Sequence, residues 1–321
     1  MSSLIEQAAQ RLEQLRQAGV AIPESEIDLA PTPAVVPAPR PQPPAADAPS
    51  QSRRVELDLD ALLAAGIVTP NAPRSAIADQ YRVIKRPLIA NALGRGAATV
   101  THGNLIMITS AMAGEGKTFT SVNLAMSIAS ELDHTVMLVD ADVARPSVLR
   151  TLGLPAGPGL LEVLEGKAEL ADVMMRTNVD KLTVLPAGTP HPKATELLAS
   201  DAMRALLDNM ATRYPDRIII FDSPPLLLTT ESRVLATNMG QIVVVVAAGK
   251  TPQSATRQAL DTIESCPVRM LVLNKARLDG KAYGYGYGYG YGYAYGYGYG
   301  YGADAAAAPG AAPGGAAEER H

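Results

Sequence analysis

The sequence predicts an α/β fold built on a doubly wound, mostly parallel sheet, with a disordered linker before it and a disordered tail after it. Three observations lead to this prediction. Short, continuously apolar segments alternate with segments of helical length between about residues 75 and 279. A glycine-rich turn that ends in Gly-Lys-Thr follows the first apolar segment. Two later apolar segments each end in aspartate, at Asp140 and Asp222.

Composition sets the broad class of protein. The chain has 321 residues, of which 47% are hydrophobic, enough to bury a sizeable core. Its formal net charge is -4, so we expect no nucleic-acid partner. The most hydrophobic stretch, which begins at Ile242, has eight residues, whereas a transmembrane helix needs about 20. The first residues also lack the pattern of a secretory signal, so we expect a cytoplasmic protein with no transmembrane segment, whose association with a membrane would require a partner.

The first part of the chain predicts a tethered helix and not a core. Residues 1–20 read as an amphipathic helix, because Ser3 and Glu6 form a capping box and apolar residues share one face. Residues 21–74 read as a linker rich in proline, which cannot pack a core. Within this linker, the half-apolar stretch that begins at Val55 is expected to dock on a neighbouring surface.

The central part of the chain, residues 75–279, predicts the folded domain. Its apolar segments do not alternate with polar residues, which is typical of parallel strands covered on both faces. Helical segments lie between most of them, so right-handed crossovers follow. The expected strands are residues 105–109, 135–140, 182–187, 217–222, 241–248 and 270–274.

The glycine-rich turn predicts a phosphate site. The sequence SAMAGEGKT runs from the first expected strand into a helix, with Ala111 where the usual first glycine would stand. In such a P-loop the backbone N–H groups cradle phosphates, the lysine reaches the outer ones and the following hydroxyl binds magnesium. A chance glycine turn before a helix is the alternative. The expected ligands of ATP and Mg²⁺ are Ala113, Gly114, Glu115, Gly116, Lys117, Thr118 and Phe119.

Three aspartates are expected at the same edge of the sheet. Asp140 and Asp142 end one expected strand and Asp222 ends another, and the carboxyl ends of parallel strands meet where ligands bind. Asp222 suits a magnesium-holding acid, and one of the other two can take a proton from an attacking hydroxyl. For Asp142 alone, a turn or helix cap is the alternative.

These motifs together resemble the bacterial tyrosine kinases of polysaccharide synthesis, whose fold is of the P-loop NTPase type shared with deviant-Walker ATPases. The resemblance rests on SAMAGEGKT, VMLVDADVARP, IIIFDSPP and a tyrosine-rich end. It implies that Asp140 is the base and a magnesium neighbour, beside Thr118 and Asp222, and that Asp142 joins the same network. It also places Asn274 where related ATPases hold adenine, although a structural cap is the alternative.

The same resemblance implies partners. The family forms rings through a Glu-x-x-Arg-x-x-Arg helix, for which this chain offers Asp79, Arg82, Lys85 and Arg86. The subgroup from exopolysaccharide and exosortase loci depends on an inner-membrane chain-length determinant or polysaccharide co-polymerase as activator. A cognate tyrosine phosphatase is expected as well.

The end of the chain, residues 280–321, is expected to be a disordered tail that carries the substrate. Glycine separates nearly all of its tyrosines and removes steric constraint, so any phenol can enter a narrow site. We therefore expect an ATP-dependent autokinase that modifies this tail in trans within an oligomer and so regulates exopolysaccharide polymerisation and export. The expected acceptors are Tyr283, Tyr285, Tyr287, Tyr289, Tyr291, Tyr293, Tyr295, Tyr297, Tyr299 and Tyr301.

Two alternatives stay open from the sequence. Partitioning and division-site ATPases share the fold and motifs and act as nucleotide switches without kinase activity, but they carry a signature lysine where this chain has Met112. A cohesive role for the Tyr-Gly run is a second reading, and phosphorylation does not exclude it.

Overall fold

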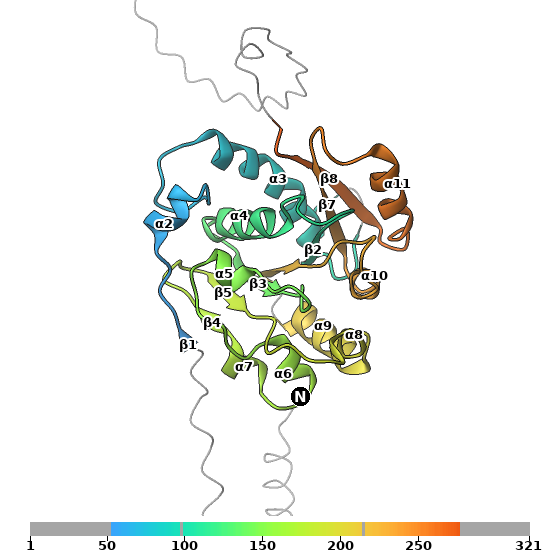
Figure 1. Cartoon of the computed structure of the whole chain (residues 1–321). Coiled ribbons are helices and arrows are strands. Elements are labelled where there is room, and N and C mark those ends of the chain that lie inside the picture. The colour runs from blue at the N-terminus through green and yellow to red at the C-terminus, as the bar shows by residue number, and fades with distance from the viewer. Residues whose placement is uncertain (1–52, 97–98, 214–215, 277–321) are drawn as a thin grey trace, which may run out of the picture. The chain divides into compact units, whose positions relative to one another are not determined.

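The computed structural model of the chain describes residues 53–96, 99–213 and 216–276. The expected N-terminal helix, the proline-rich part of the linker and the Tyr-Gly run all lie outside these residues. The described part is built around one sheet flanked by helices (Figure 1). None of its helices combines the length and apolar character that crossing a membrane requires.

The sheet of the described residues has eight strands in the order β1-β4-β5-β3-β6-β2-β7-β8. All neighbouring pairs are parallel except β4 and β5, which are antiparallel. This confirms the expected mostly parallel, doubly wound fold. The strands are β1 (Arg53–Arg54), β2 (Leu105–Ser110), β3 (Thr135–Asp140), β4 (Met175–Arg176), β5 (Leu182–Leu185), β6 (Arg217–Asp222), β7 (Gln241–Ala247) and β8 (Val268–Asn274).

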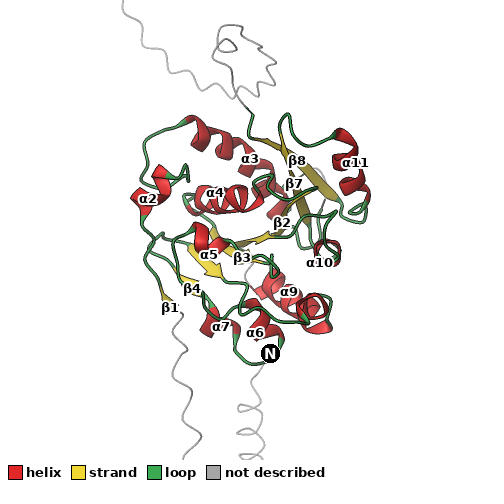
Figure 2. Cartoon of the chain, in the orientation of Figure 1, coloured by secondary structure: helices red, strands yellow, loops and turns green. Residues whose placement is uncertain are grey.

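Helices cover both faces of this sheet (Figure 2). Those on one face are α2 (Leu59–Ala64), α3 (Ala76–Ala92), α4 (Lys117–Ala129) and α5 (Val148–Thr151). Those on the other face are α6 (Leu160–Leu164), α7 (Leu170–Val173), α8 (Ala194–Leu198), α9 (Asp201–Arg213), α10 (Glu231–Ala236) and α11 (Gln253–Asp261).

The two helical layers explain why the central strands are apolar throughout. In β2, Leu105 and Met107 enter one hydrophobic core while Ile106 and Ile108 enter the other. Successive side chains of a strand point to opposite faces, so a strand covered on both sides needs no polar positions. The expected continuous pattern thus holds for the centre of the sheet.

The last strand departs from that pattern. Within the described residues β8 pairs only with β7 and forms an edge of the sheet, and half-buried positions alternate with exposed ones along it. Leu271 and Leu273 are 57% and 65% exposed. The expectation that residues 270–274 are covered on both faces was therefore wrong for the described part of the chain, which leaves that side of the edge strand exposed.

Residues 53–74 are more closely integrated than a linker would be. β1 pairs with β4, and the side chains of Leu57, Leu62 and Ile67 are buried in the same core as α3 and α4. The backbone N–H of Val68 donates a hydrogen bond to Asn123 Oδ1 of α4 at 2.7 Å. The half-apolar stretch therefore docks on the chain's own domain, and packed structure begins before residue 75.

The register of the central strands positions the site. Asp140 of β3 lies directly beside Asp222 of β6, and Ile108 of β2 lies beside Asp222 on the other side. Three neighbouring strands thus end together, and the turn from β2 into α4 lies at the same edge.

Candidate active site

The turn between β2 and α4 has the backbone shape of a phosphate-binding loop. Gly114 and Gly116 have φ of +79° and +101°, a region that glycine occupies without steric cost. A Cβ on Gly116 would also lie 2.1 Å from Asn274 Nδ2. Glycine is therefore required at residue 116 by both conformation and space.

A buried carboxylate holds this loop from inside. The side chain of Glu115 accepts a hydrogen bond from the backbone N–H of Met112 at 2.6 Å, and it also accepts one from the hydroxyl of Thr251. Thr251 follows β7 and itself accepts from the N–H of Ala247. The loop is thus tied to the neighbouring strand through one side chain, a role that the sequence reasoning did not assign to Glu115.

The end of β8 holds the loop from outside. Asn274 Nδ2 donates to the carbonyl oxygen of Glu115 at 2.9 Å, and Lys275 Nζ donates to the carbonyl oxygen of Gly114 at 2.6 Å. Asn274 Oδ1 accepts from the N–H of Lys275. The side chain of Asn274 therefore has a structural role here, which was the alternative to an adenine contact. Lys275 was not expected at the site.

Asp222 is fully buried behind the first turn of α4. Its two carboxylate oxygens accept hydrogen bonds from Thr118 at 2.6 Å and from Ser121 at 3.0 Å. Burial raises its pKa to about 6, although these two hydroxyls and the charge of Lys117 favour the carboxylate. Ser121 was missed in the sequence, where its position four residues after Lys117 on an apolar helix is the only signal.

Asp140 has one satisfied oxygen and one unsatisfied oxygen. Oδ2 accepts hydrogen bonds from the backbone N–H groups of Ser147 and Val148, each at 2.9 Å. Oδ1 is buried and has no hydrogen-bond partner among the described residues. Burial and the nearby charge of Asp222 raise the pKa of Asp140 to about 7 despite the two backbone hydrogen bonds. Ser147 further links the two aspartates, because its hydroxyl lies 2.7 Å from that of Thr118.

Asp142 closes a turn, which was the alternative to a catalytic role that the sequence left open. Its carboxylate accepts the N–H of Arg145 at 3.2 Å. Burial raises its pKa, and the charge of Lys117 opposes that shift. Asp142 nevertheless faces the same cavity as Lys117, so capping the turn does not remove it from the site.

A cavity of about 530 Å³ lies over these residues, large enough for a nucleotide. Lys117 is largely buried at its wall, beside Thr118. The expected residues that line the cavity are Ala113, Gly114, Gly116, Lys117, Thr118, Phe119 and Asp142. Glu115 and Asn274 lie behind the loop and act through its backbone, and Asp222 lies behind Thr118.

The donor set suits a hard cation shared with a phosphate. No group of three His, Cys, Asp or Glu side chains within residues 53–96, 99–213 and 216–276 is arranged to hold a metal ion alone. Thr118, Asp222 and the unsatisfied oxygen of Asp140 are all oxygen donors close to the loop. Magnesium is typically held by one or two carboxylates together with substrate phosphates, so these residues fit it.

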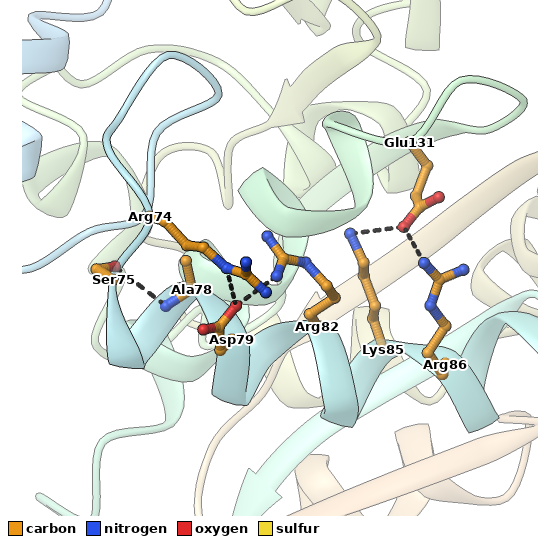
Figure 3. A network of polar contacts seen from close by, with 8 residues as sticks. All are labelled: Arg74, Ser75, Ala78, Asp79, Arg82, Lys85, Arg86 and Glu131. Carbon is orange, nitrogen blue, oxygen red and sulfur yellow. Dashed lines mark hydrogen bonds and ion pairs between the residues drawn. The ribbon is translucent and has the colours of Figure 1, made fainter. Parts of the chain in front are cut away.

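The expected ring-forming residues lie on α3 (Figure 3), and none of them lines the cavity. Asp79 forms an exposed ion pair with Arg82 and a second contact with Arg74. Lys85 is only 4% exposed, pairs with Glu131 at 2.8 Å and donates to the backbone of α4. The structure therefore assigns Lys85 to packing within the chain, because its charge is already neutralised there.

Arg86 differs from Lys85 although the two are adjacent. Its side chain is 64% exposed and lies 3.6 Å from Glu131. The residues of this group that remain on the surface are Asp79, Arg82 and Arg86.

Comparison with known proteins gives concordant matches. A family model described as "AAA domain" matches residues 103–271. The tyrosine-protein kinase YwqD of Bacillus subtilis is 31% identical over 222 residues, which covers 68% of this chain and 90% of YwqD. The tyrosine-protein kinase CpsD of Streptococcus agalactiae is 32% identical over 187 residues, or 57% of this chain and 80% of CpsD. The solved kinase domain of the Escherichia coli tyrosine kinase ETK superposes with a TM-score of 0.50 at 26% identity, covering 71% of this chain and 97% of that domain.

Proposed function

Because this chain belongs to the bacterial tyrosine-protein kinases, with a P-loop ATPase domain as its catalytic unit, we propose that it phosphorylates the tyrosines of its own Tyr-Gly run. The observation that supports this substrate is the contact of Asn274 and Lys275 with the P-loop. The chain passes the phosphate site there, and Tyr283 follows Ala276 by seven residues. That segment spans at most roughly 25 Å.

The donor is ATP, held by the P-loop. Backbone N–H groups around Gly114 and Gly116 face the phosphates, and Lys117 neutralises their charge. Thr118 and Asp222 would hold Mg²⁺ with Asp140 as its neighbour, and the ion when bound would offset the charge of the β- and γ-phosphates. The adenine base would lie on the side of the loop where Asn274 contacts the backbone of Glu115.

The acceptor is a phenol with a pKa near ~10, so it arrives protonated at neutral pH. Its oxygen forms a bond to the γ-phosphorus while the bond from that phosphorus to the β–γ bridging oxygen breaks, which yields phosphotyrosine and ADP. The phenolic proton passes to Asp140, whose free oxygen has no competing donor among the described residues. The proton then leaves to solvent.

The biological role that we propose is control of exopolysaccharide polymerisation and export. Unmodified tails would occupy the active sites of neighbouring copies, in trans, and so hold an oligomer together. Each phosphate adds about -1.5 to -2 charges, so a heavily modified tail is repelled from its neighbours. An inner-membrane chain-length determinant or polysaccharide co-polymerase would activate the kinase, and a cognate phosphatase would reset it.

One experiment tests the activity. The purified full chain is incubated with Mg-ATP, and the tail is analysed by mass spectrometry with and without a peptide of the activator. We expect phosphate on several tyrosines between residues 283 and 301, and none with Lys117→Met or Asp140→Ala. A chain that hydrolyses ATP and changes its association state while its tyrosines stay unmodified would instead be a nucleotide switch of the partitioning class. Labelling that persists with Lys117→Met would identify a contaminating kinase.

A further inference from the structure

A groove of about 630 Å³ runs between α3 and the outer edge of β8. It is lined by residues 271–276 and, on α3, by residues that include Val83 and Ile84. Val83 is 74% exposed, and together with Leu271 and Leu273 it accounts for three of the seven large hydrophobic side chains that the described residues leave exposed. Such a gathering of apolar side chains on a surface is typical of a binding site. No residue of this groove lines the nucleotide cavity.

The backbone along the outer edge of β8 is ready to pair with another strand. The N–H of Ala248 donates to the carbonyl oxygen of Asn274 at 2.8 Å, so the backbone of Asn274 faces β7. Successive residues of a strand turn their N–H and C=O groups to alternate sides. The N–H and C=O groups of Arg269, Leu271 and Leu273 therefore point away from β7, where the described residues place no other strand (Figure 1).

The two edges of the described sheet differ in their protection against a further strand. β1, at one edge, has two residues, and both are arginine. Short length and charged side chains are common means by which an edge strand is kept from pairing. β8, at the other edge, has seven residues, of which only Arg269 is charged and none is proline. The sequence of β8 therefore leaves its edge open to an added strand.

We propose that the Tyr-Gly run of the same chain adds to β8 as a further strand, antiparallel to it, with its tyrosine rings in the groove. Eight residues, 275–282, lie between Asn274 and Tyr283. They are too few for the crossover of about a dozen residues that a parallel pair needs. They include Lys275, whose φ is +58°, and the pair Asp279-Gly280, which is typical of tight reversals.

The alternation of tyrosine and glycine suits this edge. In an extended segment, the tyrosines of the run point to one face and the glycines to the other. The face toward α3 has a wall for aromatic rings, formed by Val83 and Ile84. A phosphate on such a ring would add about -1.5 to -2 charges against this apolar wall, so the groove would hold the unmodified run.

The length of β8 limits how much of the run it can hold. A strand of seven residues that begins at Tyr283 contains four of the ten tyrosines of the run. The other six, from Tyr291 to Tyr301, would stay outside the groove and could reach an active site. The inference concerns the unmodified chain and goes beyond the kinase activity proposed above, which it does not require.

Amide hydrogen exchange of β8, measured by NMR in the absence of ATP, tests this placement. The full chain is compared with a chain that lacks residues 283–301 and with one that lacks only residues 291–301. A further variant of the second shortened chain carries serine in place of each of its four remaining tyrosines, which prevents another part of the run from taking their place. The N–H groups of Met270 and Val272 face β7 and serve as an internal reference.

We expect the N–H groups of Leu271 and Leu273 to exchange at least about tenfold more slowly in the full chain than in the chain lacking residues 283–301. The chain that lacks only residues 291–301 should keep this protection, and its serine variant should lose it. In the full chain, Val83→Glu should reduce the protection because it places a charge in the wall of the groove. Leu132→Glu changes a leucine that is 86% exposed outside the groove and should have no effect.

Three outcomes would overturn the inference, and each points elsewhere. Equal exchange at Leu271 and Leu273 with and without residues 283–301 would show that the run does not lie on β8. Protection that needs no tail and increases with protein concentration would show that two copies pair through their β8 edges. Protection that needs the tail but disappears on dilution would assign the added strand to a neighbouring copy. Failure to form phosphotyrosine would contradict the proposed function and leave this inference standing.

Discussion

Thr118 donates its hydroxyl hydrogen to a carboxylate oxygen of Asp222 at 2.6 Å, across 104 residues of sequence. A hydroxyl has one hydrogen and two lone pairs, so beside this bond Thr118 accepts from the hydroxyl of Ser147 at 2.7 Å and keeps one lone pair for a cation. Asp222 thereby orients the hydroxyl of Thr118 toward a cation, although Asp222 does not itself line the cavity.

This contact predicts a difference between two substitutions of Thr118. Thr118→Val removes the donor and leaves Asp222 buried with Ser121 as its remaining side-chain donor among the described residues. We expect a loss of about 1–3 kcal/mol in the free energy of unfolding and weaker magnesium-dependent nucleotide binding. Thr118→Ser should retain both properties. Denaturant titration and nucleotide binding with and without Mg²⁺ measure the two effects, and equal behaviour of the two variants would contradict the role.

Asp140 predicts a pH-dependent stability in the absence of metal. Its pKa is raised from 3.8 to about 7 in the folded chain, so the folded state binds this proton more tightly than the unfolded state does. That stabilisation is complete below about pH 4 and is lost as the pH rises toward 7. Each pKa unit corresponds to about 1.4 kcal/mol, so the loss amounts to a few kcal/mol at most.

Asp140→Asn keeps an acceptor for the Ser147 and Val148 N–H groups and removes the titration. We therefore expect the variant to gain stability relative to wild type between pH 5 and pH 8 in metal-free buffer. Denaturation curves at several pH values measure the difference. A difference that does not change with pH would show that the carboxyl of Asp140 titrates normally.

Glu115 predicts an effect on nucleotide affinity through the loop and not through direct contact. Glu115→Ala frees the N–H of Met112 and the hydroxyl of Thr251. We expect nucleotide Kd to rise about tenfold, since the phosphate-binding N–H groups lose their fixed directions. Glu115→Gln keeps one acceptor oxygen and should recover much of the affinity. Isothermal titration with ADP tests this, and a normal Kd for Glu115→Ala would leave the contact without consequence.

Among the charged residues of α3, we expect Lys85 to affect the stability of the fold and Arg82 and Arg86 to affect the formation of an oligomer. Lys85→Met removes a buried ammonium that pairs with Glu131 and should destabilise the chain by about 1–3 kcal/mol. Arg82→Ala and Arg86→Ala affect exposed pairs and should change stability by less than about 1 kcal/mol. If α3 forms an interface between copies, these two arginine variants should reduce the oligomer in light scattering. An unchanged oligomer would place the interface elsewhere.

Charge on the tail predicts a change in association. Ten modified tyrosines would add on the order of -15 to -20 charges to a chain whose formal charge is -4. We expect the oligomer to become smaller after incubation with Mg-ATP. A chain that lacks residues 283–301 should form an oligomer only if other contacts, such as those of α3, are sufficient to hold it together. Light scattering before and after incubation measures this. An oligomer of unchanged size with a heavily modified tail would refute the release mechanism.

The sequence predicted the fold and the phosphate loop well because both depend on local signals. Continuous apolar segments mark strands covered on both faces, and glycine before Lys117 marks a loop that opens a helix. Because the carboxyl ends of parallel strands meet at one edge of a sheet, the sequence predicted that Asp140 and Asp222 lie close together. The strand register confirms that they are neighbours.

What the sequence did not predict depends on contacts between distant residues. The bond from Val68 to Asn123 that ties residues 53–74 to the domain has no local signature. The same holds for the pairing of Glu115 with Thr251 and for the placement of Lys275 on the loop. Lys85 looked like a surface residue because its helix continues the charged pattern, but its partner Glu131 lies at the end of α4.

The attachment of β8 to the phosphate loop has a kinetic consequence. If the tail is the substrate in trans, as proposed above, each tail within an assembled oligomer is tethered near a neighbouring active site at an effective concentration on the order of millimolar. Any other protein substrate would have to compete with that standing supply. Other proteins would then be phosphorylated mainly after the tethered tyrosines have been modified. The number of tyrosines in the tail would therefore set the length of this delay.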